Sequence, residues 1–147
     1  VEGFAQLKQA HPKLKWTTGE HEYTRYGFRR LIENRFIDIL QPDVMWVGGL
    51  TELLKISAHA SAYDLPVIPH GSGPYSYHFI ASQPHSPFCE YVAASPDGRS
   101  ILPVFGNLFT GEALPENGKL RISSAPGFGM EIADRSLLRE VPVELAA

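Results

Sequence analysis

The chain has 147 residues, close to the size of one globular domain, and 44% hydrophobic against 20% charged residues excludes a disordered protein. Its 13 basic and 16 acidic residues give a net charge of -3 without a basic run, so we expect no nucleic-acid partner. A single cysteine, Cys89, excludes an internal disulfide. No hydrophobic stretch reaches the roughly 18 residues of a membrane span, so we expect no membrane partner and a cytoplasmic location.

The first third of the chain reads as strand, helix, strand. Hydrophobic and polar residues alternate over 13–18, which predicts a short strand ending near Glu20. Hydrophobic residues then recur at helical spacing over 24–35. A second strand is predicted over 36–40, and it stops at Pro42 because proline cannot donate to a central ladder.

The same alternation continues to residue 92. The clearest helix is predicted over 50–62, where leucines and small residues recur every three or four positions. A third strand over 65–69, a weaker helix over 75–83 and a fourth strand over 88–92 follow. Strands that alternate with helices predict an α/β fold with a parallel sheet.

We expect residues 1–99 to form this βα body and residues 100–147 to form a mostly irregular tail. Glycine and proline are scattered through the tail, and its one predicted strand covers 119–122. Because the tail shows little hydrophobic periodicity, we expect it to pack against another body.

Each predicted strand ends at an ionisable residue: Glu20, Asp43, His70 and Glu90. These residues are 23, 27 and 20 positions apart, about one βα repeat each. In a closed (β/α) barrel such ends converge on one rim, where active sites are built, whereas in an open sheet they spread along an edge. The convergence of three carboxylates and a histidine favours the barrel.

Taken singly, most of these residues have an ordinary structural explanation. Glu20 could be an acid at a helix N-terminus, Asp43 a turn residue and His70 a hydrogen-bonded structural histidine. Glu90 is harder to explain, because a carboxylate inside a hydrophobic strand needs a partner. The joint pattern favours a catalytic site.

The ordered set of motifs resembles the second half of the barrel in the mandelate racemase group of the enolase superfamily. The segments that carry this resemblance are Gly19-Glu20, Gln41-Pro42-Asp43, Gly48-Gly49-Leu50-Thr51-Glu52, Pro69-His70-Gly71 and Glu90. The segment 125–131 is similar to the Pro-Gly-Leu-Gly segment that closes the chain in that group. Segments 69–78 and 104–109 resemble, more narrowly, the members of the group that dehydrate L-rhamnonate.

This resemblance implies residue roles. Glu20 would be a Mg²⁺ ligand at the end of the fifth barrel strand. Asp43 and His70, at the ends of the sixth and seventh strands, would form a dyad in which the carboxylate orients the imidazole that acts as general base. Glu90, at the end of the eighth strand, would donate a hydrogen bond from its protonated form to the developing enediolate, in a site kept apolar by Phe88 and its neighbours.

The implied reaction is the magnesium-dependent dehydration of an acid sugar, first of all L-rhamnonate to 2-keto-3-deoxy-L-rhamnonate. It would run by abstraction of the α-proton and syn loss of water, with a small-molecule acid sugar as partner and a homo-oligomer as the working form. Another acid-sugar dehydratase or racemase of the same group is the alternative, because the same dyad serves several reactions.

A complete barrel takes about 250 residues, and only four strand-helix units are counted here. We therefore expect the chain to be the C-terminal half of a (β/α) barrel within a longer protein, and to be inactive alone. The other two metal ligands of the group have no counterpart in residues 1–19. A non-catalytic half-barrel module remains an alternative.

Overall fold

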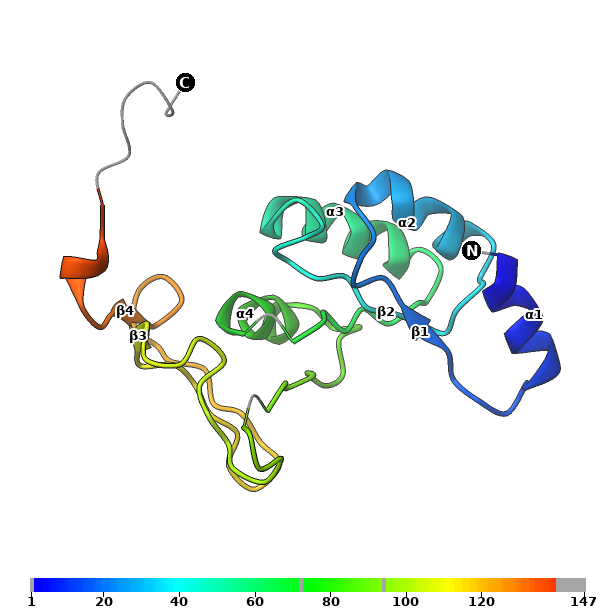
Figure 1. Cartoon of the computed structure of the whole chain (residues 1–147). Helices are drawn as coiled ribbons and strands as arrows, with labels where there is room; N and C mark the ends of the chain where they lie inside the picture. The colour runs from blue at the N-terminus through cyan, green and yellow to red at the C-terminus, as the bar shows by residue number, and fades with distance from the viewer. Residues whose placement is uncertain (1, 72, 94, 140–147) are drawn as a thin grey trace. The chain divides into compact units, whose positions relative to one another are not determined.

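The computed structural model describes residues 2–71, 73–93 and 95–139. The chain divides into two compact units, Val1–Val92 and Ala93–Ala147. The first unit contains α1 (Glu2–Ala10), β1 (Thr17–Thr18), α2 (Thr24–Glu33), β2 (Ile39–Leu40), α3 (Leu50–Ser61) and α4 (Pro74–Ser82) (Figure 1). The second contains β3 (Phe109–Thr110), β4 (Glu131–Ile132) and a 3₁₀ turn, Arg135–Leu137.

The first unit is built on parallel pairing. β1 lies parallel to β2, with Thr17 opposite Ile39 and Thr18 opposite Leu40. Residues 65–70 continue the sheet on the other side of β2, through a parallel bridge between Leu40 and Val67 and a hydrogen bond from His70 N to Pro42 O of 2.9 Å. Two of the four predicted strands therefore form, each shorter than predicted, and the third, 65–69, lies beside β2 but makes only an isolated bridge.

The fourth predicted strand, 88–92, is wrong, since these residues form no strand in the structure. The cause is in the neighbouring segment. Along 67–71 alternate N–H groups face away from β2: Val67 N donates to His85 O at 3.3 Å, Pro69 has no N–H, and Gly71 N donates to the Glu90 side chain instead of a backbone carbonyl. Of these three positions, only Val67 makes a backbone hydrogen bond on this side, and it pairs with His85 rather than with residues 88–92. These contacts are too few to form a strand.

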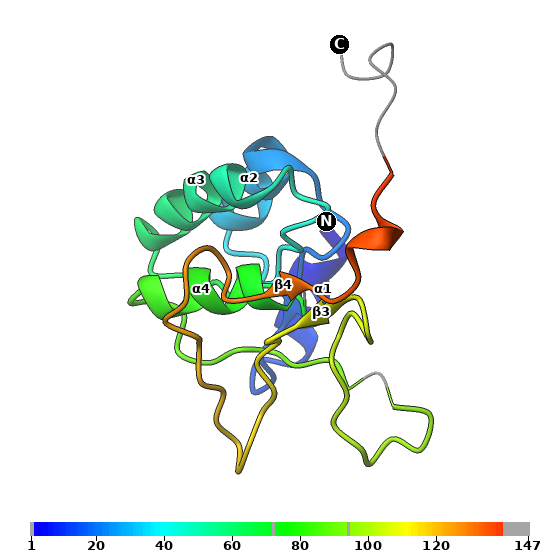
Figure 2. The same ribbon diagram turned by 90° about the vertical axis from the view of Figure 1, so that its left-hand side faces the viewer.

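The three predicted helices α2, α3 and α4 are confirmed. Figures 1 and 2 show α2 and α3 side by side, and their hydrophobic faces share one core with β2 and residues 65–67. Proline at the first turn of α4 suits a position where no N–H is needed. The helix α1 was not predicted; it has no fully buried residue, and only Phe4 packs against the core.

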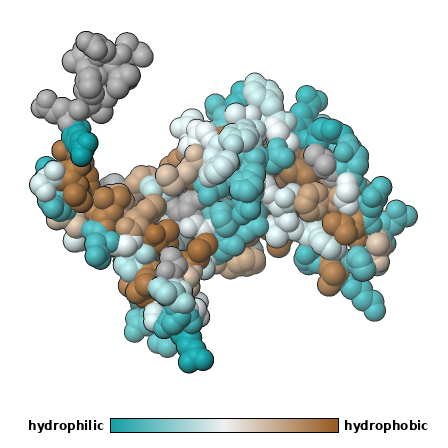
Figure 3. Space-filling model, viewed as in Figure 1, coloured by the Kyte–Doolittle hydropathy of each residue, from teal (hydrophilic) through white to brown (hydrophobic). Residues whose placement is uncertain are grey.

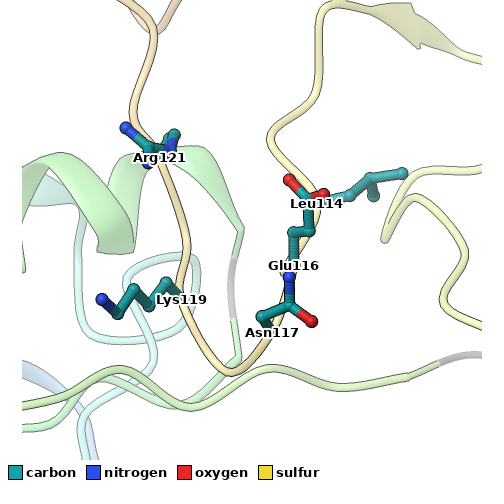
Figure 4. A pocket seen from close by; sticks show the side chains of 5 residues that line it. All are labelled: Leu114, Glu116, Asn117, Lys119 and Arg121. Atoms are coloured by element: carbon teal, nitrogen blue, oxygen red, sulfur yellow. The ribbon is translucent and has the colours of Figure 1, made fainter.

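The second unit pairs β3 with β4 in antiparallel fashion, Phe109 opposite Ile132. The strand predicted at 119–122 is wrong, because residue 119 makes only an isolated bridge to Glu116 across a turn. This turn lines a cavity of about 540 Å³ together with Leu114 and Arg121, and it contains no predicted site residue (Figure 4).

Hydrophobic side chains of the second unit remain on its surface. All the buried hydrophobic residues of the described chain lie before residue 87. In Figure 3 hydrophobic groups are visible over the segments 101–138, where the exposed ones include Ile101, Leu108, Leu114 and Leu137. Within the described residues, none of the helices is both long and apolar enough to cross a bilayer.

Ile56→Ala should lower the free energy of unfolding by about 2–5 kcal/mol, because Ile56 on α3 is completely buried and alanine leaves a cavity. The matched control is Leu54→Ala on the same helix, where the side chain is 44% exposed and we expect a much smaller loss. Urea unfolding followed by far-ultraviolet circular dichroism measures both. Equal losses would contradict the assignment of the core face.

Candidate active site

The turn after β1 presents Glu20. Gly19 is buried with φ of +135°, and a Cβ atom there would lie 2.6 Å from Cε1 of Phe28 in the core. Only glycine fits this conformation and this space. The Gly19-Glu20 pair thus turns the chain sharply at the strand end and leaves the Glu20 side chain 45% exposed.

His70 lies between two carboxylates. Its Nε2 is 3.3 Å from Oε2 of Glu20, and its Nδ1 is 2.7 Å from Oε2 of Glu90. The parallel arrangement of β1, β2 and residues 65–70 brings residues 20 and 70 to one edge, and Glu90 reaches them from a segment that forms no strand. Three of the four residues predicted from strand ends therefore meet at one place.

Hydrogen-bond donors surround Glu90. Gly71 N donates to Oε2 at 2.7 Å, and Nε2 of Gln41 donates to Oε1 at 2.9 Å. The apolar surroundings expected from Phe88 are wrong, because that side chain is 56% exposed. Cys89 is partly buried, and this burial raises the pKa of its thiol, as expected for a packing residue. The role of Glu90 as a proton-bearing donor stays a prediction.

Asp43 is placed differently from the expected dyad. Its Oδ1 accepts a hydrogen bond of 2.7 Å from Met45 N, and no ion pair joins it to His70 among the described residues. The backbone nonetheless brings the two residues to neighbouring strand ends, through the bond from His70 N to Pro42 O. The orienting role of Asp43 stays a prediction.

Within residues 2–71, 73–93 and 95–139, no group of three or more histidine, cysteine or acidic side chains is arranged to hold a metal ion. Glu20 alone offers a half-exposed carboxylate, the oxygen donor that Mg²⁺ prefers. Its chemistry fits a Mg²⁺ ligand, and its place in a metal site stays a prediction.

The sequence analysis does not predict three sets of contacts around this edge. Gln41 could have been found, because it lies two positions before Asp43 and alternation puts both side chains on the same side. The rings of His21 and Tyr23 lie 4.9 Å and 5.9 Å from the Trp46 ring. An ion pair between Arg25 and Glu52 joins positions 27 residues apart, which no periodicity reveals.

The chain matches known proteins over nearly its whole length. Residues 1–136 match the family model described as enolase C-terminal domain-like. L-rhamnonate dehydratase from Saccharopolyspora erythraea is 46% identical over 138 residues, which cover 93% of this chain and 35% of that protein. The chain spans about a third of the length of the curated relatives it matches.

Solved structures resemble it as well. The crystal structure of rhamnonate dehydratase from Gibberella zeae complexed with Mg is 61% identical, with a TM-score of 0.86 over 92% of this chain and 34% of that chain. L-talarate dehydratase from Polaromonas sp. JS666, complexed with Mg and L-glucarate, is 27% identical, with a TM-score of 0.75 over 89% of this chain and 34% of that chain.

The stability of the chain should fall in acid partly through Glu52. The hydrogen bond from Arg25 N, reinforced by the Arg25 guanidinium, holds the pKa of Glu52 below its ordinary value of 4.5. A carboxyl whose pKa is lowered on folding contributes stability that is present above the ordinary value and is lost as the pH falls through the lowered one.

Unfolding free energies measured from pH 6 to pH 3 should therefore decline more steeply for the wild-type chain than for Glu52→Gln. Asp64→Asn is the control, since Asp64 lies outside the Arg25–Glu52 pair and should leave the slope unchanged. Parallel curves for wild type and Glu52→Gln would contradict this contribution.

Proposed function

Because this chain belongs to the enolase C-terminal domain-like family, we propose that it carries the acid–base residues of a magnesium-dependent acid-sugar dehydratase. Membership confirms the α/β class and the C-terminal half of a barrel that the sequence predicts. The proposed substrate is L-rhamnonate and the product 2-keto-3-deoxy-L-rhamnonate. Support for this substrate comes from the names of the relatives that are 46% and 61% identical.

The observation that carries the proposal is the placement of His70 between Glu20 and Glu90. An imidazole is the side chain best suited to take and return a proton near neutral pH. In the proposed reaction His70 removes the α-proton at C2, and the electron pair of that C–H bond forms an enediolate. His70 then returns the proton to the hydroxyl leaving C3, so that water departs from the same face and the enol becomes the 2-keto product.

The chain's other residues would support this proton transfer. Glu90 lies on the Nδ1 side of the imidazole, 2.7 Å away, where it would hold the ring and face the substrate carboxylate. Asp43, on the neighbouring strand end, would orient His70 once substrate is bound. Glu20 would hold Mg²⁺, which supplies the positive charge that stabilises the enediolate.

Activity is tested in a chimera in which residues 1–136 of this chain replace the matching segment of the Gibberella zeae enzyme. With Mg²⁺ and a panel of acid sugars, a semicarbazide assay should detect 2-keto-3-deoxy product from L-rhamnonate above all others. Preferred turnover of L-glucarate or L-talarate would favour the alternative acid-sugar dehydratase, which the likeness to the Polaromonas enzyme supports. A folded, metal-loaded chimera that turns over none of them would reject the proposal.

His70→Asn in the chimera should lower kcat by about 10²–10⁴-fold and abolish exchange of the substrate α-proton with deuterium from solvent, because the general base is lost. His59→Asn is the matched control, since His59 lies on α3 beside Tyr63 and Glu33, away from the proposed site. Retained exchange in His70→Asn, followed by proton NMR in D₂O, would remove His70 from the role of base.

Glu20→Gln should weaken the dependence of activity on Mg²⁺ by about tenfold or more, because an amide is a poorer ligand for a hard cation. The measurement is the Mg²⁺ concentration for half-maximal rate. Glu22→Gln, two residues along, controls for the loss of charge on the same turn. An unchanged magnesium titration in Glu20→Gln would take Glu20 out of the metal site.

A further inference from the structure

We propose that the ion pair between Arg25 and the largely buried carboxylate of Glu52 is a positioning device that fixes the turn carrying Glu20 against the loop carrying Asp43. The inference rests on the proposed function, in which Glu20 holds the metal and Asp43 serves the base. Neither Arg25 nor Glu52 would touch substrate. They would fix the distance between Glu20 and Asp43, whose side chains must act on the same substrate.

The pair is more completely bonded than a surface salt bridge. Both oxygens of Glu52 lie 2.8 Å from Nη1 of Arg25, and Oε1 also accepts a 2.8 Å hydrogen bond from Arg25 N. Lys55 lies 3.5 Å from the same carboxylate. The Glu52 side chain is only 11% exposed. A carboxylate this buried is retained only when its partners compensate for lost hydration, so removal of the Arg25 side chain would cost stability by taking away its two 2.8 Å contacts and leaving the more distant Lys55.

The pair joins the two segments that lead from the site. Arg25 is in the first turn of α2, five residues after Glu20, and Glu52 is in the first turn of α3, nine residues after Asp43. Figure 1 shows these two helices side by side. The helix α2 follows the turn that carries Glu20, and α3 follows the loop that carries Asp43. The contact between the first turns of the two helices therefore sets how far apart that turn and that loop lie.

Three further contacts cross the same gap. Thr24 N donates to Val47 O at 3.0 Å, and the Trp46 ring lies 4.9 Å from the His21 ring and 5.9 Å from the Tyr23 ring. Thr24 has a φ of +54°, a conformation that is costly for a β-branched residue and persists only where its surroundings impose it. Strain at this point indicates that the cross-link between the loops is tight.

The first test is made on the chain itself, because it does not depend on catalysis. Trp16 and Trp46 are the chain's two tryptophans, so Trp16→Phe leaves fluorescence that reports on Trp46 alone. In that background Glu52→Gln should make Trp46 markedly more accessible to acrylamide, because the loop that carries it loosens. Arg29→Gln is the control, since it breaks the exposed Arg29–Glu33 pair within α2, the helix that carries Arg25. Unchanged quenching in Glu52→Gln would overturn the inference.

The second test is made in the chimera described above. Glu52→Gln should weaken equilibrium Mg²⁺ binding, measured by calorimetry, by about tenfold, as coupling across a lost contact of about 1.4 kcal/mol gives. It should also lower kcat more than it changes KM for L-rhamnonate. Arg25→Lys keeps the charge, is expected to fold and should show a smaller change of the same kind. Lower thermal stability with unchanged Mg²⁺ affinity and kcat would show a merely structural pair and overturn the inference.

The two proposals fail separately. If the unmutated chimera dehydrates no acid sugar, the proposed function fails, while the quenching of Trp46 still decides whether Arg25 and Glu52 hold the two loops together. If the chimera is active and Glu52→Gln behaves like Arg29→Gln in every measurement, only the positioning role fails.

Discussion

Parallel pairing along β2 determines where Glu20, Asp43 and His70 lie. The backbone of residues 65–70 runs beside β2 so that His70 N bonds to Pro42 O, and β1 lies on the other side of β2 with Thr18 opposite Leu40. Strand ends in a parallel sheet share one edge, so residues separated by 20 to 50 positions become neighbours there. The ring of His70 then reaches Glu20 on one side and Glu90 on the other.

What the sequence predicts well is local. The helices α2, α3 and α4 were found because their hydrophobic residues repeat at helical spacing, and the site residues because each stands where a hydrophobic run stops. The family was recognised from the order of short motifs, and the match over residues 1–136 confirms it. The lengths of the strands were overestimated, since a strand also needs a partner whose N–H groups face it.

What escapes prediction depends on distant residues. Proline at position 69 removes the N–H that a fourth strand would have needed, so the pattern at 88–92 forms no strand and Glu90 accepts the Gly71 N–H through its side chain. Donors rather than hydrophobic groups therefore surround Glu90. The pairing of Arg25 with Glu52 is likewise a matter of which helix ends meet. Glu52 belongs to the 48–52 motif, but nothing in the one-dimensional pattern identifies Arg25 as its partner.

The charges at the edge bear on the proposed metal without reference to any relative. Glu20 and Glu90 place two carboxylates against the ring of His70, and Asp43 lies at the neighbouring strand end. An acid sugar brings a further carboxylate, and the enediolate formed from it carries more charge still. Like charges in a partly dehydrated site repel strongly. A cation held by Glu20 would offset the repulsion between these carboxylates and the enediolate. The same positive charge would therefore favour both the binding of an acid sugar and the removal of its proton by His70.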